Sequence, residues 1–182
     1  MPVYHAAIGT SEDYIERRAK HRQAHLERIL GLRTQGLVVA GGLAPNGRTA
    51  ELFYRAEQRS NVARLIEEDS YYLAGSWTTY TLRAFTEFIE PLELTPLVTD
   101  GSRCATLVEG TAPQADNPQL ALIGLRGNGR LGFGGFFEAG ATLALLTTAN
   151  AAEAIGWLAE TRFWEEGSLT ARPFLYKGDV AL

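Results

Sequence analysis

In the first 34 residues, the hydrophobic pattern of a strand is followed by that of a helix. Residues 3–8 are rich in apolar side chains and end at Gly9-Thr10, which is typical of a short strand. From residue 15 to residue 34 nothing breaks a helix, and apolar residues recur three and four positions apart as on a buried helical face. We therefore expect a strand and then a helix, which Thr10 or Ser11 caps and which could kink at Gly31.

Four further segments complete a β-α-β-β-α-β order. We predict strands at 37–43 and 49–55 joined by a Pro45-Asn46-Gly47 turn, a second helix that Ser60 caps and that ends at 73–75, and a strand at 77–85. This order is the ferredoxin-like arrangement, so the sequence predicts an α+β fold.

The glycines of this first part return later with the same spacing. Gly31, Gly36, Gly41 and Gly42 are matched by Gly124, Gly129, Gly134 and Gly135, which indicates an internal duplication. The second copy is predicted to have strands at 104–109, 131–137, 142–148 and 169–176 and helices at 119–125 and 151–160. Between the copies, two prolines and a glycine without helical period mark a linker. We expect a first domain at 1–90, a linker at 91–103 and a degenerate second domain at 104–182.

Composition narrows the classes of function. Of the 182 residues, 46% are hydrophobic and 21% are charged, which is ordinary for a globular protein. The net charge of −4 comes without a basic cluster, so nucleic acid is not an expected partner. The single cysteine, Cys104, cannot form an intrachain disulfide, and no signal peptide or 20-residue apolar run is visible. We expect a cytoplasmic protein that does not bind membranes.

Polar positions that differ between the copies are candidates for a function of one copy alone. The glycines serve the fold, because glycine permits backbone conformations that other residues avoid. The polar residues that differ lie in the first copy: Arg22 is opposite Ala115, His25 is opposite Pro118, and Asp69 is opposite Arg162.

His25 and Asp69 each continue the apolar face of a predicted helix. His25 precedes Ile29 by four residues, and Asp69 follows Leu65 by four, so the two ionisable groups could meet if the helices share one sheet face. The structural alternative is that His25 binds a carbonyl and that Asp69 binds backbone or Arg64. Spacing alone leaves both interpretations open.

A metal site is not expected. His21 and His25 stand four apart on one helix, a spacing that can bind a metal, but no third ligand lies nearby in the sequence. We therefore predict neither a metal nor a cofactor.

Three motifs of the first copy resemble those of the YciI-like (YCII-related) family. They are Arg22-x-x-His25-Leu26, the segment from Gly36 to Gly41, and the run from Asn61 to Gly75 with Asp69-Ser70-Tyr71 and Ala74-Gly75 near its end. The family patterns are R-x-x-H-L, G-x-L-x-x-A-G-P and D-P-[FY]-x-x-A-G. This chain departs from them at Gly42 and Ser70, where the family has proline, so the backbone there has more freedom.

The resemblance implies both an architecture and a site. It implies two ferredoxin-like units that pair as an intrachain dimeric α/β-barrel, a pseudo-dimer that could pair again into a homodimer. It also implies that His25 and Asp69 face each other in a cleft. Some family members are cofactor-free enzymes on small aromatic or enol-like compounds, including a dehydrochlorinase, and others have no assigned activity.

Two hypotheses of different classes follow. In the first, His25 is a general acid or base of a lyase, dehydrochlorinase or isomerase, Asp69 supports its charged form, and Arg22 binds an anionic group of a small-molecule ligand. Tyr4, Tyr71 and Trp77, with Phe53, would supply apolar walls. In the second, the chain is a non-catalytic ligand-binding or structural module in which His25 and Asp69 form a polar pair. The sequence alone leaves open whether the protein is an enzyme.

Overall fold

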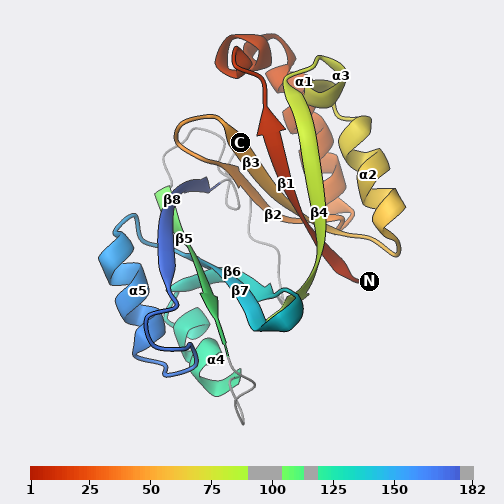
Figure 1. Cartoon of the computed structure of the whole chain (residues 1–182). Helices are drawn as coiled ribbons and strands as arrows, with labels where there is room; N and C mark the ends of the chain where they lie inside the picture. Colours follow the sequence, from red (N-terminus) through yellow and green to blue (C-terminus); the bar gives the residue numbers. More distant parts are fainter. Residues whose placement is uncertain (90–103, 113–118, 177–182) are drawn as a thin grey trace. The chain divides into compact units, whose positions relative to one another are not determined.

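The computed structural model describes residues 1–89, 104–112 and 119–176, and contacts divide the chain into two compact units. Of the described residues, the first unit contains Met1–Ala84 and Tyr176, and the second contains 85–89, 104–112 and 119–175 (Figure 1). The predicted linker at 91–103 lies outside the described residues. So do Ala115, Pro118 and the side chain of Cys104.

The first unit follows the predicted order of elements, except that two helices stand where one was predicted. Its elements are β1 (Val3–Thr10), α1 (Tyr14–Thr34), β2 (Val38–Leu43), β3 (Thr49–Arg55), α2 (Arg59–Glu67), α3 (Ser70–Leu73) and β4 (Trp77–Glu87). Strand β3 lies between β1 and β2 and is antiparallel to both. Just before β4 begins, the Ser76 carbonyl accepts the Ser11 amide at 2.9 Å, which joins the end of β1 to the start of β4.

The core of the first unit lies between the sheet and its helices, which Figure 1 shows on one side of the strands. Strand residues alternate between the two faces, so every second side chain points toward the helices. Buried side chains on this face include Ala6, Ile8, Leu52 and Tyr54 from the strands and Ile29, Val62 and Ile66 from the helices.

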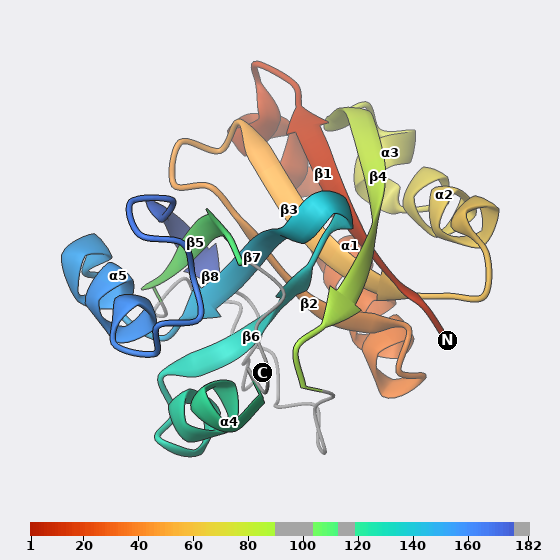
Figure 2. The ribbon, with the colours of Figure 1, turned by 60° about the horizontal axis from the view of Figure 1, so that its bottom comes forward.

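The second unit has a comparable order. Its elements are β5 (Cys104–Thr111), α4 (Gln119–Gly127), β6 (Leu131–Phe136), η1 (Glu138–Gly140), β7 (Ala141–Leu146), α5 (Ala151–Ala159) and β8 (Thr170–Tyr176). Strand β5 pairs with β7 and β8, and β6 pairs with β7 and with the last residues of β4, all antiparallel. Helices α4 and α5 lie on one side of these strands (Figure 2).

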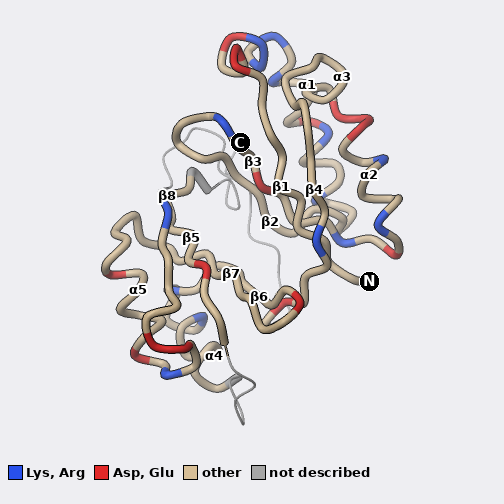
Figure 3. Tube along the Cα trace, in the orientation of Figure 1, with Lys and Arg blue, Asp and Glu red and all other residues tan. Residues whose placement is uncertain are grey.

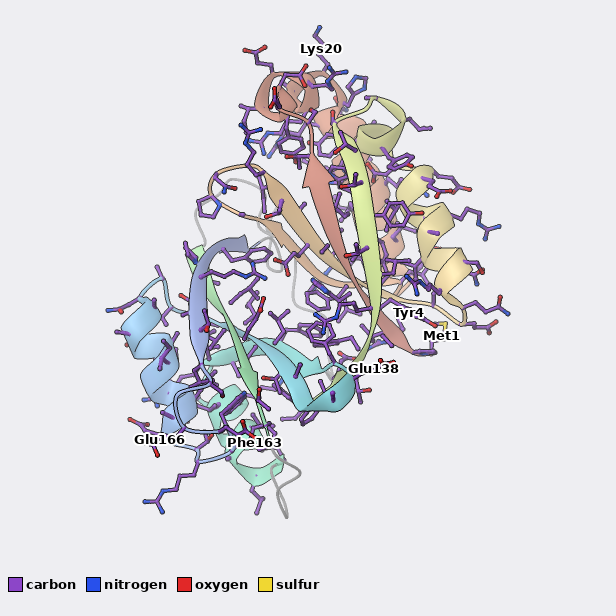
Figure 4. The ribbon with its side chains drawn as sticks, viewed as in Figure 1. Met1, Tyr4, Lys20, Glu138, Phe163 and Glu166 are labelled. Carbon is purple, nitrogen blue, oxygen red and sulfur yellow. The ribbon has the colours of Figure 1, made fainter. Side chains whose placement is uncertain are left out.

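Aromatic rings fill the interior of the second unit. Phe88 meets Phe136, Phe163 and Trp164 edge to face, at centroid separations of 4.8, 5.9 and 6.0 Å. The Trp164 indole N–H donates to the Thr142 hydroxyl at 2.9 Å, so its polar atom is satisfied inside the core. Figure 4 labels Phe163 within this unit.

Helices α1 and α4 end in the same way. Gly36 and Gly129 have φ values of 74° and 70°, the left-handed conformation that glycine adopts without strain. In each case the next amide reaches back to the helix: Leu37 donates to Leu32 at 2.9 Å, and Arg130 donates to Leu125 at 2.8 Å. This is a Schellman motif. Strands β2 and β6 each also carry an irregularity soon after this turn.

The start of α1 differs from the prediction. Thr10 belongs to β1 and donates its hydroxyl to the Gly47 carbonyl at 2.6 Å, and Asp13, not Thr10 or Ser11, occupies the N-cap position. The Asp13 carboxylate makes no capping hydrogen bond and instead binds Arg17 at 2.6 Å, an ion pair that lowers the pKa of Asp13 to about 2. The predicted cap is therefore wrong. Helix α1 continues through Gly31 without a break.

The second predicted helix is two helices. It begins at Arg59 with Gln58 in the N-cap position, and the Ser60 hydroxyl contacts the Gln58 side chain at 3.4 Å, so Ser60 is not the cap. Helix α2 ends at Glu67, and a separate helix α3 begins at Ser70. The prediction of one helix ending at 73–75 is wrong, because Asp69 starts a new helix.

The whole is a mixed α+β fold with antiparallel strands. Basic and acidic residues are interspersed along α1 and α2 (Figure 3). None of the helices that the structure describes is long and apolar enough to cross a membrane.

Replacing Gly36 by alanine tests the role of the helix end. The positive φ of Gly36 forces a β-carbon into a strained conformation, so Gly36→Ala should lower the free energy of unfolding by about 1 kcal/mol in urea titrations. Gly31→Ala is the control, because Gly31 lies inside α1 with open space around its Cα, and alanine there should stabilise by up to ~1 kcal/mol. Equal effects of the two substitutions would contradict this account.

Candidate functional site

Helix α1 brings His25 to the sheet. Ile29 and Leu32 are buried on the inward face of the helix, and His25 precedes them by one and two turns, on the edge of the same face. The side chain of His25 is only 12% exposed. A polar ring at this depth needs a hydrogen-bond partner.

Asp69 lies where the chain turns between α2 and α3. Its backbone is extended, with φ −71° and ψ 140°, and its carboxylate accepts the Tyr71 amide at 2.9 Å as the N-cap of α3. Aspartate is among the best N-cap residues, which explains why the helix restarts here. The side chain of Asp69 is 1% exposed.

The two residues bind each other. His25 Nδ1 lies 2.9 Å from Asp69 Oδ1 and 3.0 Å from Oδ2. Because a carboxylate only accepts, the Asp69 contact assigns the proton of a neutral His25 ring to Nδ1 and leaves Nε2 as an acceptor. His25 and Asp69 therefore meet, as one sequence interpretation predicted, and Asp69 also binds backbone, as the structural alternative predicted.

Aromatic rings surround the imidazole. The Tyr71 ring stacks on His25 with centroids 4.0 Å apart and an interplanar angle of 14°. The Trp77 ring meets His25 edge-on at 5.3 Å and 83°, and the Tyr14 ring meets Tyr71 edge-on at 5.8 Å. These contacts limit the rotation of the imidazole, so the orientation of Nε2 is set by packing as well as by Asp69.

A pocket opens beside His25 between α1 and the sheet. Its empty volume is about 520 Å³, which includes space open to solvent. Its walls are mostly apolar or small, a typical composition for a site that binds a small organic molecule. The lining residues are Tyr14, His25, Leu26, Ile29, Val38, Gly41, Gly42, Leu43, Ala50, Leu52 and Trp77.

Tyrosine hydroxyls and arginines add a polar side to the aromatic cluster. Burial raises the pKa of Tyr14 and of Tyr71, so both hydroxyls stay protonated at neutral pH. The positive charge of Arg18 opposes this shift of the pKa at both tyrosines, and that of Arg22 opposes it at Tyr71. Arg22 therefore acts on the cluster electrostatically, although it does not line the pocket.

Contacts between α1 and the segment after α2 hold the pair in place. The Ser70 hydroxyl donates to the His21 carbonyl at 3.3 Å, and Arg17 donates to the Ala74 carbonyl at 3.2 Å. Arg28 binds Glu68 at 2.9 Å, next to Asp69. Each contact is modest by itself, but together they fix the distance between His25 and Asp69.

The other predicted site residues fall into two groups. Tyr71 and Trp77 contact His25 directly. Tyr4 packs at the edge of the hydrophobic core near the start of β1, close to Met1 in Figure 4, and is not among the lining residues. Within the ranges that the structure describes, no three His, Cys, Asp or Glu side chains cluster as metal ligands, and His21 contributes its backbone carbonyl.

The sequence interpretation did not include Tyr14 or the glycines of β2. Tyr14 precedes His25 by eleven residues, about three helical turns, so helical spacing places both on one face of α1 and could have indicated Tyr14. Gly41 and Gly42 were interpreted as scaffold, yet both line the pocket. A residue without a side chain leaves room for a ligand, and periodicity does not reveal that function.

A second histidine–carboxylate pair lies on the other face of the same sheet. His5 Nε2 is 2.8 Å from Glu51 Oε2, and both residues are buried. The alternation of β1 and β3 places this pair opposite the core residues Ala6 and Leu52. Strand alternation could have put His5 and Glu51 on one face, but their contact depends on the β1–β3 register.

Comparisons with known proteins address the fold. No protein-family model matches the chain, and no curated protein matches it in sequence. A crystal structure of a putative monooxygenase from Lactobacillus acidophilus NCFM matches 99% of this chain and 98% of its own, with a TM-score of 0.59 and 9% identity. A heme-binding protein from Thermus thermophilus matches 97% of this chain and 92% of its own, with a TM-score of 0.51 and 9% identity.

A third structure is similar over a shorter stretch. It is 5-chloro-2-hydroxyhydroquinone dehydrochlorinase from Burkholderia phenoliruptrix AC1100, which matches 44% of this chain and 89% of its own, with a TM-score of 0.39 and 17% identity. At these identities, the first two matches show a shared fold and nothing about activity, and the third adds no argument.

Substitutions at Asp69 test whether it joins two elements. Asp69→Ala removes both the cap of α3 and the partner of His25, so it should lower the free energy of unfolding by about 2 kcal/mol in urea titrations. Asp69→Asn keeps an acceptor for the Tyr71 amide and should cost less. Asp13→Ala, at an exposed N-cap without a capping bond, is the matched control and should change little. If Asp69→Ala lowered the free energy of unfolding no more than Asp13→Ala does, the claim that Asp69 connects α1 to α3 would be wrong.

Proposed function

We propose that this protein belongs to the YciI-like family and uses the His25–Asp69 pair for cofactor-free acid/base chemistry on a small aromatic or enol-like compound. The observation that carries the proposal is the hydrogen bond from His25 Nδ1 to Asp69 at 2.9 Å, on a histidine that lines a pocket. A buried carboxylate behind a histidine is the arrangement by which proteins orient a general base.

The chemistry follows from the two ring nitrogens. Nε2 of the neutral ring takes a proton from an O–H or an acidic C–H of the ligand, and Asp69 stabilises the imidazolium that forms. The electron pair left on the ligand then forms a new double bond. If chloride leaves, the step is a dehydrochlorination, and if His25 returns the proton at another carbon, it is an isomerisation. Apolar walls such as Leu26 and Ile29 limit the access of water to the ionised intermediate.

The proposal includes the architecture implied by the family resemblance: two ferredoxin-like units that form a pseudo-dimer within one chain. Support comes from the order of elements in each unit and from the shared helix ends at Gly36 and Gly129. The second unit has an aromatic interior around Phe88 and Trp164, which fits a copy kept as a partner and not as a site. Pairing into a further homodimer remains a prediction.

The two departures from the family pattern have structural counterparts. Ser70, which replaces a proline, donates its hydroxyl to the His21 carbonyl and so ties α3 to α1. Gly42, which replaces the other proline, lines the pocket. At Ser70, this hydrogen bond offsets the backbone freedom that the loss of proline implies. At Gly42, the absence of a side chain leaves space for a ligand.

The alternative is a ligand-binding or structural module without catalysis. One observation favours it: Asp69 already has a structural function as the N-cap of α3, and a histidine partner could simply satisfy its remaining acceptor capacity. In that case the pocket would bind a ligand without changing it.

A matched pair of histidine substitutions separates the two. We expect the protein to release chloride from monocyclic chlorohydroquinones, or to promote deuterium incorporation into cyclic 1,3-diketones, and His25→Asn to lower either rate by about 100-fold or more. His21→Asn is the control, because this ring lies on the same helix outside the pocket lining and should leave the rate unchanged.

A wild-type rate in His25→Asn would refute the catalytic proposal. If the wild-type protein bound members of this panel without chloride release or deuterium incorporation, the binding-module alternative would be favoured.

A further inference from the structure

One donor in the pocket wall is buried without a well-formed hydrogen bond. Trp77 is 2% exposed, and its indole Nε1 lies near the Tyr14 hydroxyl but makes no hydrogen bond of full geometry to a residue that the structure describes. The indole N–H can only donate, so burial without an acceptor is unfavourable. The other buried tryptophan of the chain, Trp164, shows the usual solution, since its N–H donates to Thr142. An unsatisfied donor in a pocket wall indicates that a ligand supplies the acceptor.

A second donor lies beside it. Tyr14 is 4% exposed and lines the same pocket as Trp77 and His25. Burial raises the pKa of Tyr14, and hydrogen bonding to its hydroxyl from Arg18 and, less strongly, from the Trp77 N–H partly counteracts this rise. Because that pKa stays above its usual value, the Tyr14 hydroxyl keeps its proton at neutral pH and can donate it in a hydrogen bond.

The surroundings favour a negative acceptor. The Arg18 guanidinium lies 5.4 Å from the centroid of the Tyr14 ring. Tyr14 and Trp77 line a pocket whose other walls are mainly apolar, and the charge of Arg18 lies beside it over the Tyr14 ring. In such a site a localised oxygen anion is stabilised more strongly than in water, because the donors are already oriented.

We propose that the Trp77 indole N–H and the Tyr14 hydroxyl together bind a ring oxygen of the ligand that becomes a phenolate or enolate as His25 removes a proton. This deepens the proposed function and rests on it for the catalytic step, but the binding of the anion does not depend on His25. The ligand class is a monocyclic ring with an ionisable oxygen: the ring packs against the aliphatic walls and the oxygen faces Trp77 and Tyr14.

The two donors have separate functions in this arrangement. Tyr14 comes from the first turn of α1, and Trp77 comes from the first residue of β4, so the oxygen is bound from two elements. His25, from the middle of α1, is the proton acceptor and not an anion donor. Ligand binding and proton transfer can therefore be separated by substitution.

4-Nitrophenol is a suitable probe, because its phenolate absorbs visible light and reports its own ionisation. We expect the phenolate to bind the wild-type protein, and Trp77→Phe and Tyr14→Phe each to weaken its binding by about tenfold. Each variant should also shift the ionisation of the bound probe to higher pH. Trp157→Phe, in the second unit beside Arg130, is the matched control and should bind as the wild type does.

Two further measurements separate an anion site from simple packing. 4-Nitroanisole has the same ring without an ionisable hydroxyl, and its affinity should be unchanged in Trp77→Phe and Tyr14→Phe. In spectra of ¹⁵N-labelled protein, the Trp77 indole resonance should move downfield when the phenolate binds. Circular dichroism confirms that each variant is folded before binding is measured.

The outcomes decide the two proposals independently. Three results would overturn the anion site. The phenolate could bind wild type and both variants equally, the variants could lose as much affinity for 4-nitroanisole as for the phenolate, or the phenolate could fail to bind the wild type. His25→Asn should still bind the phenolate. If His25→Asn kept full turnover while Trp77→Phe lost phenolate affinity, the catalytic proposal would fail and the anion site would stand.

Discussion

The hydrogen bond between His25 Nδ1 and Asp69 is the interaction on which the first unit depends. It crosses from the middle of α1 to the break between α2 and α3, and Asp69 also caps α3 through the Tyr71 amide. One carboxylate therefore sets the position of a helix and the tautomer of a histidine. Because the carboxylate is buried, the loss of either partner leaves an unsatisfied polar group in the core, and such a loss is unfavourable.

The aromatic cluster follows from the same constraint. Capping by Asp69 starts α3 at Ser70, and this start brings the Tyr71 ring onto the His25 imidazole at 4.0 Å. Trp77 follows α3 after the turn at Gly75, whose φ is 68°, and meets both rings edge-on. The geometry of the pocket thus depends on a helix of four residues that could hardly persist without its cap. In the second unit, aromatic rings pack against one another instead.

Much of the fold could be predicted from the sequence, because hydrophobic period and glycine position are local properties. Strand β3 was predicted with its observed bounds, and α1 with its observed end at Thr34. The caps were wrong for a physical reason: Ser11, Asp13 and Ser60 all have capping side chains, and the choice between them depends on competing partners such as Arg17. The break at Asp69 was missed because the apolar spacing continues across it.

The site was less predictable than the fold. The inward positions of His25 and Asp69 followed from helical spacing, but their contact required the packing of two elements. The incomplete hydrogen bonding of the Trp77 N–H could not be foreseen, because it is a property of three-dimensional surroundings. Tyr4 was predicted to line the ligand site because its ring is aromatic, but it packs at the edge of the core instead.

The protonation of the His25 ring tests the central claim most directly. In long-range ¹H–¹⁵N spectra of protein labelled at histidine, neutral His25 should carry its proton on Nδ1, and the Nε2 resonance should be that of a bare nitrogen that moves when a phenolic ligand binds. A proton on Nε2 of the neutral ring, or an Nε2 resonance that the ligand leaves unchanged, would contradict a general base held by Asp69.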